Sequence, residues 1–193
     1  MPRGSRKLGV VVSNASPLDF LTKVGRLDIL KAFTNKVIIP KQVYAEIVER
    51  AAAQGFPSAN ILQREVDSSW IEVMDPPDDD LMLQLSRVRG IHLGEAQAIR
   101  LAKAEEIKLI LVDDRLGADL AEVEGLQPMG TIALLIYACV EKYVDFSEFM
   151  ECLSKLEAKG FWLRPMVQER AVKIVRDEST KQGRGKEMKE TFT

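Results

Sequence analysis

The sequence predicts a three-layer, Rossmann-like α/β fold with a central parallel sheet of about five strands and helices on both faces. Short apolar runs alternate along most of the chain with segments whose apolar residues recur at helical spacing. Two of these runs, Leu8–Ser13 and Lys108–Val112, are apolar without alternation, which is typical of strands buried on both faces. We therefore expect these two strands to be neighbours at the centre of the sheet.

The predicted elements follow one another as strand, helix, strand, which requires right-handed crossover connections. Pro17 at a first helical position indicates a helix after the first strand, with Ser16 as its N-cap. Strands are expected at Leu8–Ser13, Val37–Ile39, Trp70–Met74, Lys108–Val112 and Gln127–Met129. The main helices are expected at Leu18–Val24, Leu27–Ala32, Lys41–Ala53, Ile61–Val66, from Leu81 onward, Glu95–Glu106, after Arg115, and Ile132–Val140.

The last part of the chain is expected to contain helices only. Ser147 is placed to cap a helix over Glu148–Lys159, and a second helix follows over Pro165–Arg176. We predict a main domain over 8–144, a helical hairpin over 145–178 packed on it, and a flexible tail over 179–193. The hairpin is also expected to drive self-association into a homo-oligomer through its large apolar side chains Phe149, Leu153, Leu156, Phe161 and Trp162.

Composition narrows the class of protein. The chain has 193 residues, of which 46% are hydrophobic and 29% charged, and this excludes a disordered protein. Its net charge of −2 means that nucleic-acid binding requires a local basic patch. With 2 cysteines and 1 histidine, neither a disulfide framework nor a zinc site is expected. No apolar run reaches the ~18 residues of a membrane span, so we expect a cytoplasmic protein without membrane contact.

Oxygen-bearing side chains fall where the carboxyl ends of parallel strands are expected, which is where ligands bind in open α/β sheets. Asn14 follows the first strand, and Asp113 and Asp114 follow the fourth. Glu46 and Glu95 lie in helices that begin near this same edge. Carboxylate and amide oxygens are the ligands of hard divalent cations such as Mg²⁺ and Mn²⁺.

Each position also has an ordinary structural explanation. Asn14 is a common turn residue, Glu46 suits a solvated helix face, and Glu95 complements a helix dipole. Arg115 alone could compensate the acidic pair that precedes it. A serine at position 16 is explained if it caps the helix that follows the first strand. The metal hypothesis therefore depends on the joint placement of these residues.

Several segments resemble PIN-domain proteins, specifically a prokaryotic branch of toxin-like nucleic-acid-binding proteins. The resemblance spans about Val10 to Arg176. Its motifs are Val12–Leu18, Gly25–Leu30, Ile39–Ile47, His92–Ile99 and Leu111–Gly117, with Gly130-Thr131 and the turn at Lys159–Phe161 in addition.

The resemblance implies a PIN-like fold and a Mg²⁺- or Mn²⁺-dependent endoribonuclease that hydrolyses phosphodiester bonds of single-stranded RNA. It also implies the toxin of a type II toxin–antitoxin pair, with a small antitoxin as partner. The family's metal-binding acids correspond to Asn14, Glu46, Glu95 and Asp114, with Asp113 as a further catalytic residue. Ser16, Lys41 and Arg115 are the expected contacts to RNA.

Two alternatives remain open. The chain carries Asn14 where the family has its first acid, so it could be a catalytically degenerate PIN-like RNA-binding or regulatory module. It could also be a phosphate-binding regulator that resembles receiver domains. The absence of a Gly-rich loop after Leu8–Ser13 argues against the second alternative.

Overall fold

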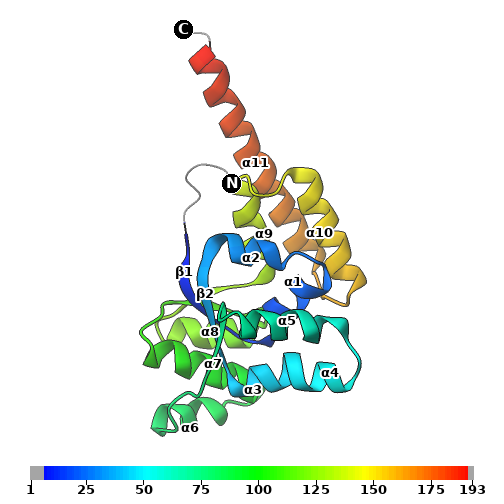
Figure 1. The fold of residues 1–193 in the computed structure, drawn as a ribbon. Coiled ribbons are helices and arrows are strands. Elements are labelled where there is room, and N and C mark those ends of the chain that lie inside the picture. The colour runs from blue at the N-terminus through cyan, green and yellow to red at the C-terminus, as the bar shows by residue number, and fades with distance from the viewer. Residues whose placement is uncertain (1–6, 191–193) are drawn as a thin grey trace. The chain divides into compact units, whose positions relative to one another are not determined.

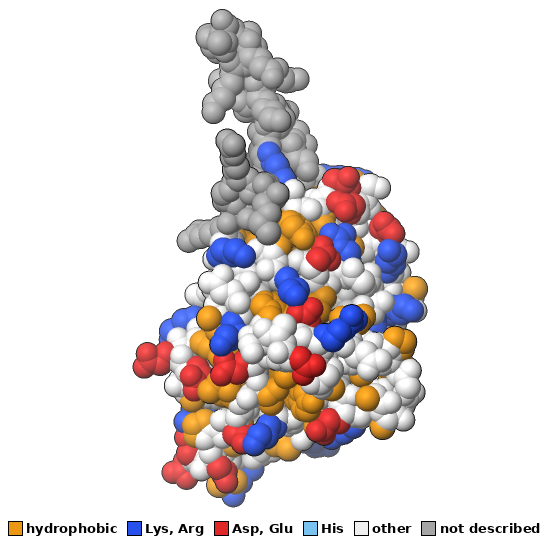
Figure 2. Space-filling view, viewed as in Figure 1, with side chains coloured by type: hydrophobic (Ala, Val, Ile, Leu, Met, Phe, Trp, Pro, Cys, Tyr) orange, Lys and Arg blue, Asp and Glu red, His pale blue; other side chains and the backbone are white. Residues whose placement is uncertain are grey.

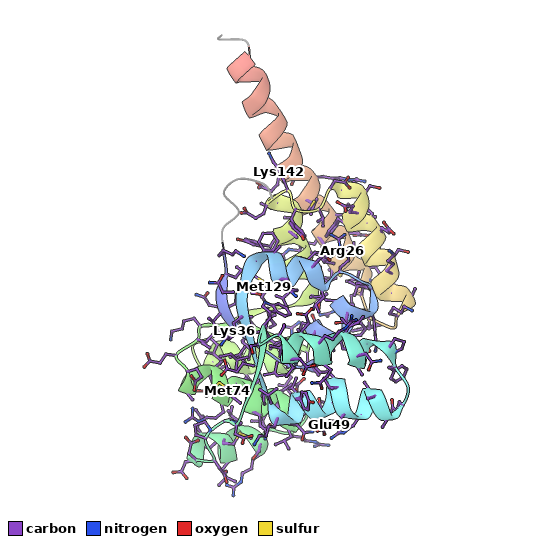
Figure 3. All side chains as sticks on the ribbon, in the orientation of Figure 1. Arg26, Lys36, Glu49, Met74, Met129 and Lys142 are labelled. Atoms are coloured by element: carbon purple, nitrogen blue, oxygen red, sulfur yellow. The ribbon has the colours of Figure 1, made fainter. Side chains whose placement is uncertain are left out.

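The computed structural model describes the backbone of residues 7–190 and the side chains of residues 7–178. It contains a five-stranded parallel sheet in the order β3-β2-β1-β4-β5 (Figure 1), which confirms the predicted fold class. The strands are β1 (Gly9–Ser13), β2 (Thr34–Pro40), β3 (Ile71–Met74), β4 (Leu109–Leu111) and β5 (Gln127–Met129). Met74 and Met129, labelled in Figure 3, are the last residues of the two outer strands.

The central position of β1 explains its apolar sequence. Consecutive residues of a strand point to opposite faces of the sheet. Val11 and Val12 are both 0% exposed, so both faces of β1 are covered. In the parallel register of β1 and β4, Val12 pairs with Ile110 and Ser13 with Leu111. The prediction that these two apolar strands are neighbours is confirmed.

Helices α6 (Asp80–Ser86), α7 (Leu93–Ala104) and α8 (Arg115–Val123) cover one face of the sheet. Their apolar side chains form one buried cluster with Val12 of β1 and Ile110 of β4. Burial of this apolar surface is the main stabilising contribution. The remaining elements that precede β5 are α1 (Ala15–Lys23), α2 (Leu27–Phe33), α3 (Lys41–Tyr44), η1 (Ala45–Arg50), α4 (Ala51–Ala53) and α5 (Pro57–Asp67).

The contacts within the chain define two compact units, and the boundary between them in the sequence falls between Thr131 and Ile132. The first contains the sheet and α1 to α8. The second contains nearly all of α9 (Thr131–Val140), together with α10 (Phe146–Ala158) and α11 (Pro165–Glu190). Helices α10 and α11 contact each other, as expected for a hairpin. The side chains of the expected tail, 179–193, lie outside the described residues. None of the helices in the described part of the chain is both long and apolar enough to cross a bilayer.

Two predicted helix caps are wrong. Helix α1 begins at Ala15, so Asn14 takes the N-cap position and Ser16 lies in the first turn. Helix α10 is capped by Asp145 and not by Ser147. The Asp145 carboxylate accepts from the Glu148 N–H at 2.8 Å, and the Glu148 carboxylate accepts from the Asp145 N–H at 2.8 Å. This reciprocal capping box satisfies two backbone donors, whereas a serine cap would satisfy one.

The predicted continuous helix over Lys41–Ala53 is also interrupted. Its middle part, η1, is a π-helical segment between α3 and α4. Each turn of a π-helix contains more residues than a turn of an α-helix, so side chains after the insertion rotate about the axis. Such segments occur frequently at functional sites, and this one contains Glu46.

Candidate active site

The polar residues that follow β1 and β4 are held together by the sheet itself. The backbone N–H of Asn14 donates to the carbonyl oxygen of Leu111, the last residue of β4, at 3.0 Å. Asp113 and Asp114 come two and three residues later in the chain. The carboxyl ends of the two central strands therefore place Asn14 beside the segment that carries both acids.

Asn14 is buried and carries an unsatisfied oxygen. Its side chain does not cap α1, although its backbone occupies the N-cap position. The residue is 4% exposed, and its Oδ1 accepts no hydrogen bond from any described residue. A buried amide oxygen without a donor costs free energy, so it indicates a missing partner such as a cation, a water or a ligand.

Glu95 is the buried carboxylate of the site. It lies in the first turn of α7, where its Oε2 accepts from the His92 N–H at 3.1 Å. Burial raises the pKa of this carboxyl, and the nearby charges of Asp114 and Glu46 raise it further, while the His92 N–H acts in the opposite direction. The Glu95 carboxylate therefore interacts electrostatically with acidic side chains from two other elements, Asp114 and Glu46.

Two glycines permit this close approach. A Cβ at Gly94 would lie 3.4 Å from both carboxylate oxygens of Glu46. A Cβ at Gly117 would lie 3.6 Å from the Glu95 Cδ and 3.9 Å from the Asp114 Oδ1. The tighter neighbours are aliphatic, since a Cβ would lie 3.3 Å from the Val43 Cγ2 at Gly94 and 3.0 Å from the Val112 Cγ2 at Gly117. The glycines therefore allow α7 and α8 to pack closely against these valines beside the carboxylates. The sequence analysis did not identify these glycines, although each lies within a motif that supported the family resemblance.

The two acids after β4 have different environments. Asp114 is exposed and caps α8, because its Oδ1 accepts from the Gly117 N–H at 3.0 Å. Asp113 instead accepts from the Thr131 N–H at 2.6 Å and from the Thr131 Oγ1 at 2.8 Å. Burial is the main cause that raises the pKa of Asp113. Asp114 therefore faces Glu95, while Asp113 is held by the residue that starts α9.

The expected RNA contacts are spread around the site. Ser16 is half-buried and lines a pocket together with Glu46. Lys41 is exposed and forms an ion pair with Asp75, and Arg115 is exposed and lies 3.6 Å from Asp119. Lys, Arg, Asp and Glu are intermixed on the face drawn in Figure 2, so no large basic patch is visible there.

The donor set fits a hydrated divalent cation. Glu46, Glu95 and Asp114 supply carboxylate oxygens, and Asn14 supplies an unsatisfied amide oxygen. Among residues 7–178, no group of three or more His, Cys, Asp or Glu side chains is close enough to hold one ion directly. Mg²⁺ keeps several of its waters in proteins, so one or two direct carboxylate ligands are sufficient. Waters on the ion would then bridge the remaining oxygens.

Thr131→Val is expected to lower the free energy of unfolding by about 1–3 kcal/mol. Thr131 is 0% exposed, so the change keeps the shape of the side chain but removes a hydroxyl that donates to buried Asp113. Urea denaturation measures this loss. The matched control is Thr22→Val, in which the lost bond goes to the Leu18 carbonyl oxygen of the same helix. Equal stability losses in both variants would contradict a special role for the Thr131 hydroxyl.

Glu95 also makes the stability of the metal-free protein depend on pH. Its folded-state pKa is raised, so between the pKa of an unfolded glutamate, about 4.3, and the folded value the native state binds more protons than the unfolded state. Stability therefore decreases as pH rises through this range. In EDTA, we expect thermal unfolding from pH 4 to 8 to show this decrease for the wild type and a smaller one for Glu95→Gln. Parallel curves for the two proteins would contradict the assignment.

Comparisons with known proteins show the family of the chain. The profile of a family described as PIN domain matches residues 10–177. No curated protein has a significant match to the chain. Among solved structures, a domain of a functionally unknown protein from Methanocaldococcus jannaschii DSM 2661 is similar at 18% sequence identity and a TM-score of 0.41. The similarity covers 63% of this chain and 89% of that one.

Proposed function

Because the chain belongs to the PIN-domain family, a nuclease-like family, we propose that it is a Mg²⁺- or Mn²⁺-dependent endoribonuclease that cleaves single-stranded RNA. The observation that carries this proposal is the oxygen-rich site at the carboxyl ends of β1 and β4. There the unsatisfied Asn14 Oδ1 lies beside the segment that carries Asp114, and burial, followed by the charges of Asp114 and Glu46, raises the pKa of Glu95. Ionisable groups whose pKa is shifted by burial and by specific charged neighbours cluster at functional sites.

Each residue of the proposed active site would have a separate role in metal binding or positioning. Glu46, Glu95 and Asp114, with the amide oxygen of Asn14, would hold the ion. When bound, the ion lowers the pKa of a coordinated water and neutralises charge on the scissile phosphate. The hydrogen bond from the His92 N–H fixes the position of the Glu95 carboxylate below the protein surface. Asp113 would position the segment after β4, because both of its oxygens are already bonded to Thr131.

Ser16, Lys41 and Arg115 are proposed contacts to the RNA backbone. The proposal is best supported for Ser16, because this residue lines a pocket that also contains Glu46. The Lys41 and Arg115 side chains are 68% and 77% exposed, so their long side chains can move to a phosphate at little cost.

We also propose a cytoplasmic toxin of a type II pair that binds a small antitoxin and self-associates. Three of the side chains that predicted self-association, Phe149, Leu153 and Leu156, are buried within the chain and offer no surface. Trp162 is 81% exposed and supports the proposal of a partner on the hairpin. Light scattering of the purified chain at increasing concentration tests self-association, and a strict monomer would contradict it.

The activity is tested by incubating the full chain with end-labelled single-stranded RNA and Mn²⁺. We expect internal cleavage that stops on addition of EDTA and leaves a double-stranded RNA of the same sequence intact. RNA that stays intact at millimolar Mn²⁺ would contradict the proposal. If Asn14→Asp then cleaves this RNA, the alternative of a catalytically degenerate RNA-binding module is correct.

A further inference from the structure

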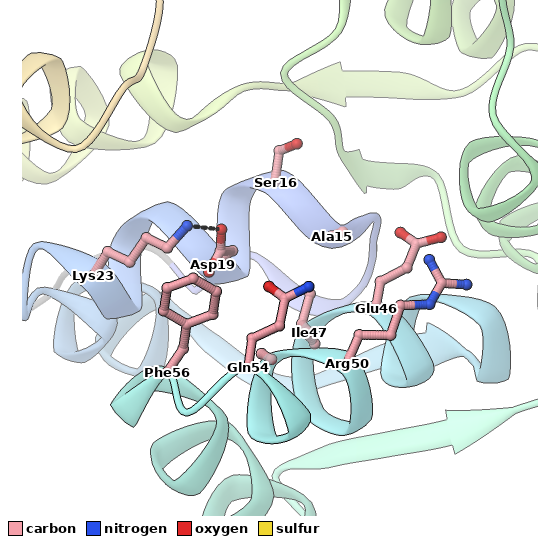
Figure 4. Close-up of a pocket in the computed structure, with 10 residues that line it drawn as sticks. Ala15, Ser16, Asp19, Lys23, Glu46, Ile47, Arg50, Gln54 and Phe56 are labelled. Carbon is pink, nitrogen blue, oxygen red and sulfur yellow. Dashed lines mark hydrogen bonds and ion pairs between the residues drawn. The ribbon is translucent and has the colours of Figure 1, made fainter.

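A pocket of about 300 Å³ lies beside Glu46, and apart from Ser16 and Glu46 the residues that line it have no role in the mechanism above. Side chains from α1, η1, α4 and the turn that follows line it (Figure 4), among them Ser16, Glu46, Arg50, Gln54 and Phe56. Glu46 belongs both to this pocket and to the proposed metal site, so a ligand in the pocket would lie next to one of the proposed metal ligands. A volume of this size accommodates a small molecule or a single monomer of a polymer.

The Phe56 ring is held in the pocket wall by a rigid backbone. At the end of α4, the Phe56 N–H donates to the Ala51 carbonyl oxygen and the Gly55 N–H donates to the Ala52 carbonyl oxygen, both at 2.9 Å. This Schellman motif requires the left-handed conformation that Gly55 adopts at φ +74°. Pro57 then begins α5, so the backbone is fixed on both sides of Phe56. The side chain is nevertheless 48% exposed.

Charged and polar groups surround this ring. The Lys23 Nζ lies 5.9 Å from the ring centroid and pairs with Asp19 at 2.6 Å. Arg50 lies one turn after Glu46 on the same side of η1, is exposed, and has no hydrogen-bond or ion-pair partner for its guanidinium among the described residues. Figure 4 shows its guanidinium close to the end of the Glu46 side chain. The pocket therefore contains the aromatic ring of Phe56, the side-chain amide of Gln54 and the guanidinium of Arg50. In Figure 4 these three groups follow one another toward Glu46.

We propose that this pocket is a nucleotide subsite that holds one unpaired base of the RNA next to the bond that is cleaved. The base stacks on Phe56, the Gln54 amide hydrogen-bonds its edge, and Arg50 pairs with the adjoining phosphate. Every base presents a π-face to an aromatic ring, and an amide both donates and accepts hydrogen bonds. The base must be unpaired to enter, so the subsite explains a preference for single strands. This inference rests on the proposed function for the position of the scissile bond.

The test measures binding separately from cleavage. Fluorescence anisotropy of a labelled single-stranded RNA is recorded with Mg²⁺ in a Glu95→Gln background, between about 50 and 200 mM KCl. Phe56→Ala is expected to raise Kd at least about five-fold, and Phe56→Trp to preserve binding because it keeps a stacking surface. Arg50→Ala is expected to reduce the slope of log K against log salt by about 0.7, the value for one phosphate of a single strand.

Leu83→Ala and Arg170→Ala are the controls, since each removes an exposed side chain outside the pocket, and Leu83 is 47% exposed, close to the 48% of Phe56. Circular dichroism melts verify that every variant is folded. Unchanged Kd and salt slope in the Phe56→Ala and Arg50→Ala variants would overturn the subsite, as would absence of RNA binding by the parent chain. If these variants lose binding as expected but the wild type never cleaves RNA, the subsite stands and the proposed nuclease activity fails.

Discussion

Glu95→Gln is expected to reduce Mn²⁺-dependent cleavage of single-stranded RNA by about 10³-fold, while the metal-free protein becomes more stable. A metal ion contributes several kcal/mol of transition-state stabilisation, and each 1.36 kcal/mol corresponds to about a factor of ten in rate. The stability gain has a separate cause. Burial and the charges of Asp114 and Glu46 disfavour ionised Glu95, and a neutral amide removes that repulsion. The amide oxygen can still accept from the His92 N–H.

Cleavage rates and melting temperatures, each with and without Mn²⁺, check both parts of this prediction. Mn²⁺ should raise the melting temperature of the wild type by mass action, and this increase should be lost in Glu95→Gln. Glu122→Gln is the matched control, because Glu122 is an exposed glutamate of α8 whose side chain forms no hydrogen bond or ion pair among the described residues. If the Glu95→Gln protein retains cleavage, Glu95 is not part of the active site.

Asn14→Asp is expected to lower the Kd for Mn²⁺ at least about tenfold, and to lower the melting temperature of the metal-free protein. The change adds a charge where an unsatisfied oxygen is already buried at 4% exposure. Attraction between a carboxylate and a divalent ion in a partly buried site easily exceeds the ~1.4 kcal/mol that a tenfold change requires. Without the ion, the same buried charge has no counterpart and destabilises the fold.

Isothermal titration with Mn²⁺, followed by thermal unfolding in EDTA, measures the two effects of Asn14→Asp. Asn60→Asp makes the same chemical change at an exposed position of α5 and should produce neither effect. An unchanged Kd for Mn²⁺ in Asn14→Asp would show that this position does not face the ion. The amide oxygen of Asn14 would then not be a ligand of the ion.

The pairing of β1 with β4 could be predicted because burial on both faces leaves a clear signal in the sequence. Leu8–Ser13 and Lys108–Val112 lack polar alternation, and the structure places β1 beside β4. The parallel sheet then places Asn14 next to Leu111, so part of the site follows from the topology alone.

The details of the site could not be predicted because they depend on contacts between residues far apart in the chain. The adjacent acids Asp113 and Asp114 look equivalent in sequence, and only Thr131, 18 residues later, distinguishes them. The π-helical segment around Glu46 leaves no pattern in the apolar spacing of Lys41–Ala53. By its sequence Asn14 could be a metal ligand or a turn residue, and only tertiary packing determines that its side chain is buried without a partner.

The most direct test of the metal-site claim is an anomalous diffraction map from crystals of the full chain soaked in Mn²⁺. The account predicts a peak among the side-chain oxygens of Glu46, Glu95, Asp114 and Asn14, with at least one carboxylate oxygen at about 2.1 Å and waters completing an octahedron. The same soak with Glu95→Gln crystals should give a weaker peak or none. A strong peak elsewhere on the protein, or no peak in the wild type at millimolar Mn²⁺, would contradict the claim that these four residues form a metal site.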